Sequence, residues 1–364
     1  MKIVLIIIAL CSAPIVLFAQ TRSNIIETNL DPRGKAELVV CSQNLQNYGL
    51  LNSVKRRVRK TTEDSLMAKE LDLVKRFTSQ ACDVIAVQEL LASNPEAGKR
   101  ALGRLAKLLQ IRTNRIFETR VSPSNDKILR LGYLVATDRA DILSTLSYAR
   151  IELPKLSEKQ RPRLFTRGPF EMQLKVKPRD NSFVKVVTLV NMHFKSKRST
   201  TYDPIGLEWE TYRMEMAEAL RRVVLNRHEH TFGSGETVLL VLGDRNSHFD
   251  AASARILEGV IRLRHFQKEG ICRLSRRGVP LCQGGNALPQ YLFSVLTTDQ
   301  QTKLQPGTYR FNDIYSWLDD ILMPAQSLPF AAANYGKEGD YSSGVVYKPM
   351  GASDHAMVWV RLNW

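Results

Sequence analysis

The stretch VLLVLGDRN, residues 238–246, is an apolar run that ends in a glycine and three polar residues. A short aliphatic run without alternation predicts a β-strand that is buried on both faces. Ligands of α/β sheets commonly bind beyond the ends of the strands. The stretch therefore predicts a sheet that places Asp244 and Asn246 at one of its edges.

The same pattern recurs along the chain. Further short runs, rich in β-branched residues, predict buried strands at 38–41, 84–87, 133–136, 184–190 and 356–362. Apolar residues recur at helical spacing over 66–77, 102–109 and 214–225. This mixture of strand and helix signals predicts an α/β fold.

The composition is that of an ordinary globular protein, with 364 residues of which 44% are apolar and 24% are charged. It excludes disorder, collagen and coiled coil as descriptions of the whole chain. Lys and Arg number 52 against 36 Asp and Glu, which gives a net charge of +16. Such a charge attracts polyanions or anionic surfaces, and it makes small neutral substrates less favoured.

Residues 1–19 predict a signal peptide, because Lys2 precedes an apolar core at 3–10 and small residues lead to Ala19. A membrane anchor is the alternative. Polar residues and a proline between 11 and 14 interrupt the run, however, and a spanning helix needs about 20 mainly apolar residues. We therefore expect cleavage near Ala19, export to a periplasm or out of the cell, and no lasting membrane insertion.

Residues 20–35 are polar and contain turn formers, which predicts a linker. No internal repeat or low-complexity tract follows. We expect residues 36–364 to form one large domain and the protein to be a monomer.

Four cysteines remain after the signal peptide, and an even count in an exported protein permits disulfides. Cys272 and Cys282 flank a basic stretch, so we expect any bridge to close that loop. Cys41 and Cys82 lie in apolar runs and are expected to be small buried side chains rather than metal ligands or a second bridge. The sequence has no CxxC pair or Cys/His cluster that would indicate zinc.

Polar groups able to bind a metal or a phosphate follow most of the strand-like runs, and two more such segments lie near the C-terminus. In chain order the motifs are Gln43-Asn44-Leu45, Val87-Gln88-Glu89, Asn191-Met192-His193, Gly243-Asp244-Arg245-Asn246, Leu318-Asp319-Asp320-Ile321 and Ser353-Asp354-His355. With these motifs in this order, the chain resembles the endonuclease/exonuclease/phosphatase superfamily, whose members include deoxyribonuclease I. The resemblance spans nearly the whole chain after the signal peptide.

The resemblance implies a deoxyribonuclease I-like fold, a four-layer α/β sandwich of two packed mixed β-sheets flanked by helices. It also implies a metal-dependent phosphodiester hydrolase, with 36–364 as its catalytic domain. Because a phosphodiester repels nucleophiles, its hydrolysis requires a divalent cation, a base that activates water, and groups that stabilise the developing charge.

Hard oxygen ligands suit Mg²⁺, and Glu89 with Asn44 fits that need. The resemblance adds Asp354, which would complete this metal site or carry part of a second one. Mn²⁺ or Ca²⁺ could take the place of Mg²⁺.

For water activation, His355 is the natural base, with Asp319 rather than Asp320 accepting its other N–H. In some schemes of the family Asp244 is itself the base, and the sequence leaves both alternatives open. Asp244 and Asn246 would orient water and phosphate. His193 would donate to a phosphate oxygen or protonate the leaving oxygen.

Two further segments resemble family segments that bring a Tyr and an Arg to the phosphate. They are Gly132-Tyr133-Leu134 and Arg167-Gly168-Pro169. Lys195 follows His193 in a basic loop and is expected to bind substrate. Two departures from the family pattern are Arg245 in place of an aromatic residue, where it could add a phosphate contact, and Trp317-Leu318 where an Arg often precedes the Asp.

The charge distribution favours nucleic acid as substrate, because basic groups gather at 55–60, 195–198 and 273–277. The leading hypothesis is an exported nuclease that hydrolyses DNA with little sequence preference. Hydrolysis of RNA as well is left open. A phospholipid phosphodiesterase of the sphingomyelinase type is a second hypothesis, but it would need an exposed apolar hairpin, whereas the long loops are polar and basic. A non-catalytic polyanion-binding protein is the third.

Overall fold

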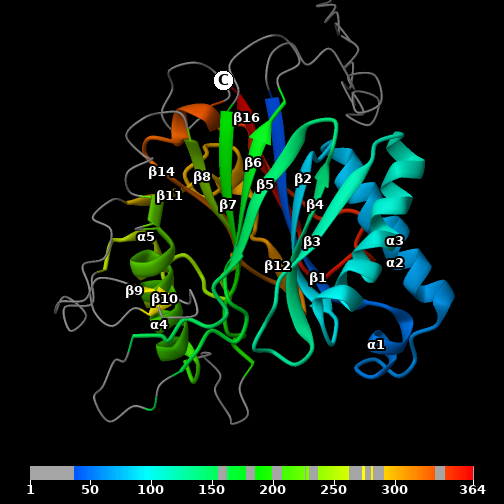
Figure 1. Cartoon of the computed structure of the whole chain (residues 1–364), viewed down its shortest axis with the longest axis horizontal. Coiled ribbons are helices and arrows are strands. Elements are labelled where there is room, and N and C mark those ends of the chain that lie inside the picture. The colour runs from blue at the N-terminus through cyan, green and yellow to red at the C-terminus, as the bar shows by residue number, and fades with distance from the viewer. Residues whose placement is uncertain are drawn as a thin grey trace, which may run out of the picture. The chain divides into compact units, whose positions relative to one another are not determined.

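Two six-stranded mixed sheets face each other in the structure, a computed structural model, and helices cover their outer faces (Figure 1). The described residues are 37–154, 161, 163–177, 185–198, 207–225, 227–228, 237–261, 273–274, 280–281, 291–332 and 341–363. They belong to one compact unit, Arg33–Trp364. The expected signal peptide at 1–19, the expected linker at 20–35 and the boundary between linker and catalytic domain lie outside them.

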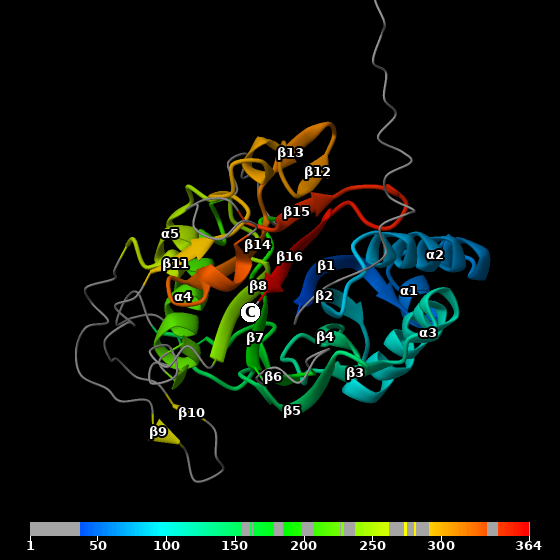
Figure 2. The same cartoon turned by 90° about the horizontal axis from the view of Figure 1, so that it is seen from above.

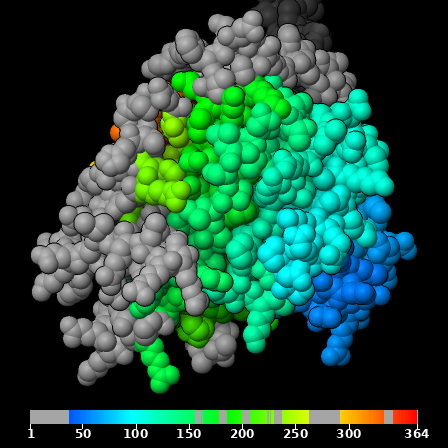
Figure 3. Space-filling model, viewed as in Figure 1, coloured from blue at the N-terminus to red at the C-terminus, as the bar shows by residue number. Residues whose placement is uncertain are grey.

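The first sheet has the order β15-β16-β1-β2-β4-β3. Its strands are β1 (Glu37–Gly49), β2 (Val84–Leu91), β3 (Phe117–Val121), β4 (Leu129–Ala136), β15 (Ser343–Val346) and β16 (Met357–Asn363). Only β1 and β2 pair in parallel. The helices of this half are α1 (Leu51–Lys55), α2 (Glu63–Ser79) and α3 (Pro95–Thr113). Figure 3 shows the face that carries β5 and these helices, where side chains form a continuous surface coloured from green to blue.

The second sheet has the order β11-β14-β8-β7-β6-β5. Its strands are β5 (Ala140–Ser147), β6 (Phe170–Val176), β7 (Lys185–His193), β8 (Thr237–Asp244), β11 (Leu292–Ser294) and β14 (Asp319–Pro324). Here only β7 and β8 pair in parallel. The helices of this half are α4 (Glu210–Ala219), which continues into a π-helical turn η1 (Leu220–Leu225), and α5 (Ala252–Glu258).

Two short hairpins and two 3₁₀ turns complete the described elements. The hairpins are β9 (Arg273–Leu274) with β10 (Pro280–Leu281), and β12 (Tyr309–Phe311) with β13 (Ile314–Ser316). The turns are η4 (Thr302–Leu304) and η5 (Leu328–Ala331). Among the described residues, no helix is long and apolar enough to cross a membrane.

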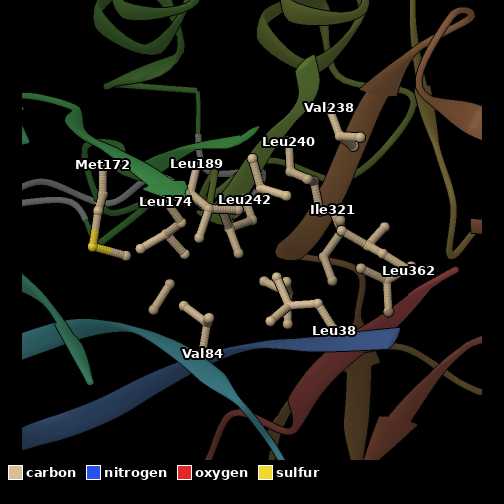
Figure 4. Packing of buried hydrophobic residues seen from close by; sticks show 14 of the residues in the cluster. Leu38, Val84, Met172, Leu174, Leu189, Val238, Leu240, Leu242, Ile321 and Leu362 are labelled. Atoms are coloured by element: carbon tan, nitrogen blue, oxygen red, sulfur yellow. The ribbon is translucent and has the colours of Figure 1, made fainter. Parts of the chain in front are cut away.

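The main core lies between the two sheets. Figure 4 shows side chains of both sheets pointing toward one another, among them Leu38 and Val84 from the first sheet and Leu189 and Leu240 from the second. On the opposite face of the first sheet, Val39 and its neighbours pack under α2 and α3. Because both faces of the central strands are covered, their sequences are apolar without alternation. The predicted four-layer α/β sandwich is confirmed.

The expectation that Cys41 and Cys82 form no disulfide was wrong. They form a disulfide, with a Cα–Cα distance of 5.9 Å, that joins β1 to the start of β2. Both side chains are buried as expected, but the parallel pairing of the two strands brings them together. A pattern of apolar runs does not say which runs become neighbours, so it could not predict this bridge. Cys272 and Cys282 lie outside the described residues.

Candidate active site

The sequence motifs meet at one edge of the sandwich because of the direction of five strands. The regular pairing of β1 with β2 is interrupted after Asn44 and Gln88, next to Glu89, and the parallel strands β7 and β8 end at His193 and Asp244. The antiparallel strand β14 begins at Asp319, opposite Asp244. A hydrogen bond from Asn44 Nδ2 to Asp244 Oδ2, 3.0 Å long, joins the two sheets at this edge.

Asp244 lies at the centre of the cluster and is almost fully buried. Its Oδ2 also accepts from Asn246 Nδ2 at 3.0 Å, and its Oδ1 accepts from the Asn246 backbone N–H at 2.8 Å. His193 Nε2 lies 3.4 Å from Oδ2. Burial raises the pKa of Asp244 to about 7, and the charge of Asp319 adds to the rise while the nearby His355 opposes it.

A sharp backbone turn puts Asp244 and Asn246 in place. Gly243 has a φ of +131°, and a Cβ there would lie 2.1 Å from the Met192 carbonyl oxygen. Asn246 has a φ of +52°, a left-handed conformation that Asn tolerates better than most residues. The glycine and the asparagine of the GDRN motif are therefore needed for its shape as well as for its polar groups.

His355 is held by Asp319. Its Nδ1 lies 2.7 Å from Asp319 Oδ2, and both side chains are buried. Burial alone would lower the pKa of His355, but the charge and hydrogen bond of Asp319, with the charges of Asp244 and Asp354, raise it to about 10. The ring is therefore a cation in this arrangement, suited to bind an anionic group.

His193 is different in charge. Its pKa is lowered well below the ordinary value by burial first, and then by the nearby cations Arg167 and His355. The imidazole is therefore neutral. Its Nδ1 is buried and has no hydrogen-bond partner within the described part of the chain. Arg167 lies behind it, donating to the Phe194 carbonyl at 2.7 Å and to the His193 carbonyl at 3.4 Å.

Glu89 lies on the open side of this cluster. It has a φ of +56° within an irregular stretch of β2, and its side chain remains partly exposed. Its Oε2 accepts from the Asn47 N–H at 3.0 Å, and its Oε1 lies 4.0 Å from His193 Nε2. Asn44 Oδ1 accepts from the Gln46 N–H at 2.9 Å.

Asp354 lies in the loop before β16. Its backbone N–H donates to Gln46 Oε1 at 3.2 Å. Its side chain lines an open pocket of about 330 Å³, together with Gln46, Arg310, Asn312, Asp313, Met350 and Ser353. Asp354 is thus at the rim of the cluster, on the side of the β12–β13 hairpin.

The donor set fits a hard divalent cation. Carboxylate and amide oxygens from Asn44, Glu89 and Asp354 are of the type that Mg²⁺ prefers. The set whose ligand atoms the structure places close together is a different one: Asp244, Asp319 and His355 each offer a ligand atom, and these atoms lie within 4.8 Å of one another. In that set the hydrogen bond between Asp319 and His355 already uses the Nδ1 of the ring.

The two adjacent aspartates of β14 point to opposite sides, as neighbours in a strand do. Asp319 contacts His355, whereas Asp320 Oδ2 lies 2.7 Å from Arg245 Nη1. The expected phosphate contact of Arg245 was therefore wrong, since this buried side chain pairs with Asp320. The unusual Trp317-Leu318 does not disturb Asp319, because Thr308 Oγ1 accepts from the Asp319 N–H at 2.9 Å.

Tyr133 is a second correction, because the structure does not bring it to the site. It is fully buried between the sheets, where its hydroxyl donates to the Phe170 carbonyl at 2.8 Å and accepts from the Asn191 N–H at 2.9 Å. Lys195 lies past the end of β7, with its Nζ 4.5 Å from the centre of the Trp209 ring. It is partly exposed there.

Three residues at the site were missed by sequence reasoning. The Tyr309 ring lies 4.7 Å from the His355 ring. Arg76 is buried and donates to the His355 carbonyl at 2.6 Å and the Ser353 carbonyl at 3.2 Å. Lys69 Nζ donates to the Gln46 carbonyl at 2.8 Å, and burial lowers its pKa to about 8. Their partners are far away in the chain, so no local pattern marks them.

The sequence matches no protein-family model, and no curated protein matches it. Solved structures do match in fold. An endonuclease/exonuclease/phosphatase family protein from Leptotrichia buccalis has a TM-score of 0.51 and 14% identity over 90% of this chain and all of its own. A humanized TDP2 from D. rerio gives a TM-score of 0.51 and 14% identity, again over 90% of this chain and 100% of that one. The human Nocturnin catalytic domain gives 0.50 and 13%, over 90% and 94%.

Proposed function

We propose that this chain, which has the fold of endonuclease/exonuclease/phosphatase family proteins, hydrolyses phosphodiesters with the help of a divalent cation. One observation carries the proposal. Five polar side chains from separate strands and loops of both sheets lie at one edge, with neighbouring polar atoms 3.0 to 4.8 Å apart. They are Asn44, Glu89, His193, Asp244 and His355. Such a gathering of buried carboxylates and imidazoles is costly without a cation or an anionic substrate to bind.

Asn44, Glu89 and Asp354 would hold the cation, which when bound neutralises charge on the phosphate. The chain's own residues do the rest. The two Asn side chains fix Asp244, which orients the attacking water. His355, held by Asp319, and the neutral His193 donate to phosphate oxygens. Asp244 takes the proton from water, because His355 is already protonated in this arrangement and could serve as the base only after losing its own proton.

Nucleic acid is the proposed substrate. The basic stretch at 55–60 is exposed and adjoins the site, because Arg57 Nε donates to Asn47 Oδ1 at 3.1 Å and the Asn47 N–H donates to Glu89. Contacts between Lys or Arg and phosphates supply most non-specific nucleic-acid affinity. DNA is the leading polymer, with RNA as a second.

The protein purified without residues 1–19 should cut circular DNA with Mg²⁺, and EDTA should stop the cutting. We expect His193→Ala and His355→Ala each to reduce the rate about 10²- to 10⁴-fold. Asp138→Asn is the control, since this exposed carboxylate pairs with Arg115 in the turn after β4, at the opposite edge. Fully active histidine variants would refute the mechanism, and salt-sensitive DNA binding without turnover would favour a non-catalytic role.

We also propose export. The Cys41–Cys82 disulfide supports it, because such bonds form and persist in oxidising compartments and are rare in the cytosol. Fractionation of producing cells would test it, with the expected result that the protein is periplasmic or extracellular and shorter by about 19 residues. A full-length protein retained in the cytoplasm would contradict it.

A phospholipid phosphodiesterase is the second candidate, and one observation favours it. The long loops suggested no apolar hairpin, but β12–β13 carries Phe311 and Ile314 with 61% and 68% of their surface exposed. Release of choline phosphate from sphingomyelin vesicles, without cleavage of DNA or RNA, would establish this function in place of the nuclease.

A further inference from the structure

The hairpin β12–β13 is built to hold a fixed geometry. Its strands are joined by Asn312 and Asp313, whose φ values of +46° and +63° make the tight two-residue turn that suits the twist of a hairpin. The pairs across it are Tyr309 with Ser316, Arg310 with Tyr315, and Phe311 with Ile314. Figure 2 shows the hairpin projecting from the sheets beyond β15.

The two faces of the hairpin differ. Residues opposite one another in an antiparallel pair share a face, and alternate residues of a strand do so as well. Arg310 and Tyr315 therefore form one face, where the Tyr315 ring contacts the Tyr347 ring at 5.6 Å. The other face is formed by Tyr309, Phe311 and Ile314, together with Ser316 opposite Tyr309. We call it the apolar face.

The apolar face begins at the catalytic cluster. Its inner residue, Tyr309, forms a backbone bridge with His355 and packs its ring 4.7 Å from the imidazole. The pKa of Tyr309 is raised by burial first, and then by the charges of Asp354, Asp244 and Glu89. Phe311 follows about 6.6 Å further along the strand, in the direction away from the site.

We propose that the apolar face is a stacking platform for an unpaired nucleobase next to the phosphate that is cleaved. This inference rests on the proposed nuclease function. A phosphate at His355 would place the neighbouring base beside Tyr309, and the exposed Phe311 and Ile314 extend the same surface. Stacking on aromatic side chains tolerates any base, which fits a nuclease with little sequence preference.

The platform implies a preference for single strands or frayed ends. Bases inside a duplex are stacked on one another and do not offer a free face to a protein. A single strand or an opened end does. We therefore expect faster hydrolysis of single-stranded than of blunt double-stranded oligonucleotides, and the difference should depend on Phe311.

A membrane is the other occupant that an exposed apolar hairpin could have, and the geometry disfavours it. The tip consists of Asn312 and Asp313, and the Asp313 side chain is 83% exposed and paired with Arg310. A hairpin that enters a bilayer does so with its tip, where these charged groups would be costly to bury. The apolar pair instead lies on the side that begins at His355.

The test compares Phe311→Ala, the double variant Phe311→Ala/Ile314→Ala and the retaining variant Phe311→Trp with the wild type. Ile111→Ala is the matched control, because Ile111 on α3 is 73% exposed and lies outside the site. The probes are an ordinary single-stranded oligonucleotide, one of equal length in which tetrahydrofuran residues replace the nucleosides, and a blunt duplex. Binding is measured by fluorescence anisotropy in EDTA, and cleavage with Mg²⁺.

We expect Phe311→Ala to weaken binding and cleavage of the ordinary strand about tenfold, with no change for the base-free strand or the blunt duplex. Phe311→Trp should retain wild-type values, and Ile111→Ala should change nothing. Because the replaced side chains are exposed, the melting temperatures should be unchanged.

Three outcomes overturn the inference in different ways. If the wild type hydrolyses the strands and Phe311→Ala treats all three probes as the wild type does, only the platform is refuted. If the wild type hydrolyses no oligonucleotide with Mg²⁺, Mn²⁺ or Ca²⁺, the nuclease function itself fails. If Phe311→Ala abolishes flotation with sphingomyelin–phosphatidylcholine vesicles but leaves oligonucleotides unaffected, the hairpin is a membrane contact.

Discussion

Gly243 sets the position of the central carboxylate, since the next residue is Asp244. Its φ of +131° is open to glycine but strained for other residues, and the Met192 carbonyl oxygen occupies the place of a Cβ. We expect Gly243→Ala to lower the free energy of unfolding by about 1–3 kcal/mol through backbone strain alone and to reduce activity. Urea denaturation measures the first effect.

The matched control is Gly103→Ala in α3, where nothing lies within 4 Å of an added Cβ. Alanine is favoured over glycine inside a helix by about 0.5–1 kcal/mol, so this variant should be more stable than the wild type. Equal effects of the two substitutions would contradict the role given to the turn at Gly243.

Arg76 is a positioning residue, because it reaches no expected ligand directly but holds the loop that carries Asp354 and His355. We expect Arg76→Lys to lower kcat about tenfold to a hundredfold, since two separate guanidinium nitrogens donate to the His355 and Ser353 carbonyls and the one nitrogen of lysine lacks that fork geometry. KM should stay near the wild-type value. Steady-state kinetics on a single-stranded oligonucleotide would show the split.

Lys75→Ala is the control for Arg76, since Lys75 lies on the same helix with its side chain 66% exposed. A fold that loosens as a whole would raise KM together with the loss of kcat and lower the melting temperature. A result of that kind would assign Arg76 a purely structural role.

At the scale of elements, Glu171 of β6 joins three segments in a buried cluster. Its Oε2 accepts from Tyr148 Oη at 2.5 Å and lies 3.0 Å from His228 Nε2. Burial alone would raise the pKa of Glu171, but the hydrogen bonds and charges of His228, Tyr148 and Arg227 outweigh it, so the pKa is below the ordinary 4.5.

Because the pKa of Glu171 is lower in the folded than in the unfolded state, its contribution to stability is present above pH 4.5. It is lost as the pH falls through the folded value. We expect the free energy of unfolding to decrease on acidification below pH 4.5, and Glu171→Gln to show a smaller decrease over the same range. Urea titrations at pH 3 to 7 test this, and parallel curves for the two proteins would refute it.

The elements were largely predictable from the sequence, because buried strands carry their signal locally. The run at 238–242 became β8 and the run at 84–87 became β2, and each ends in the polar residues that define the site. Asn44, Glu89, Asp244, Asp319 and His355 do come together. The pairing of elements leaves no such local signal, which explains the errors at Tyr133 and Arg245. The polar group of each side chain binds a partner that becomes a neighbour only in the folded protein.

At the scale of the whole molecule, the Cys41–Cys82 bond ties two strands that each supply a site residue at their far ends. The bond joins residues 41 positions apart in the sequence. Closing a loop of this length lowers the chain entropy of the unfolded state, which stabilises the folded protein by about 4 kcal/mol. We expect the Cys41→Ser/Cys82→Ser double variant to be less stable by about 2–5 kcal/mol. At temperatures where it remains folded, it should keep its activity, since neither sulfur is near the catalytic cluster.

Denaturation in urea without reductant, followed by activity assays at low temperature, would test both halves. If the double variant equalled the wild type in stability, the bond would have no structural weight. Loss of activity without loss of stability would assign the cysteines a chemical role that their burial does not suggest.

The hydrogen bond between Asn44 and Asp244 crosses from one sheet to the other, so neither sheet alone holds a complete catalytic centre. Under the proposed function, a nascent or translocating chain cannot cleave the DNA of the producing cell until the two sheets have packed together. Nuclease activity would then appear only in the last step of folding, when the two sheets come together.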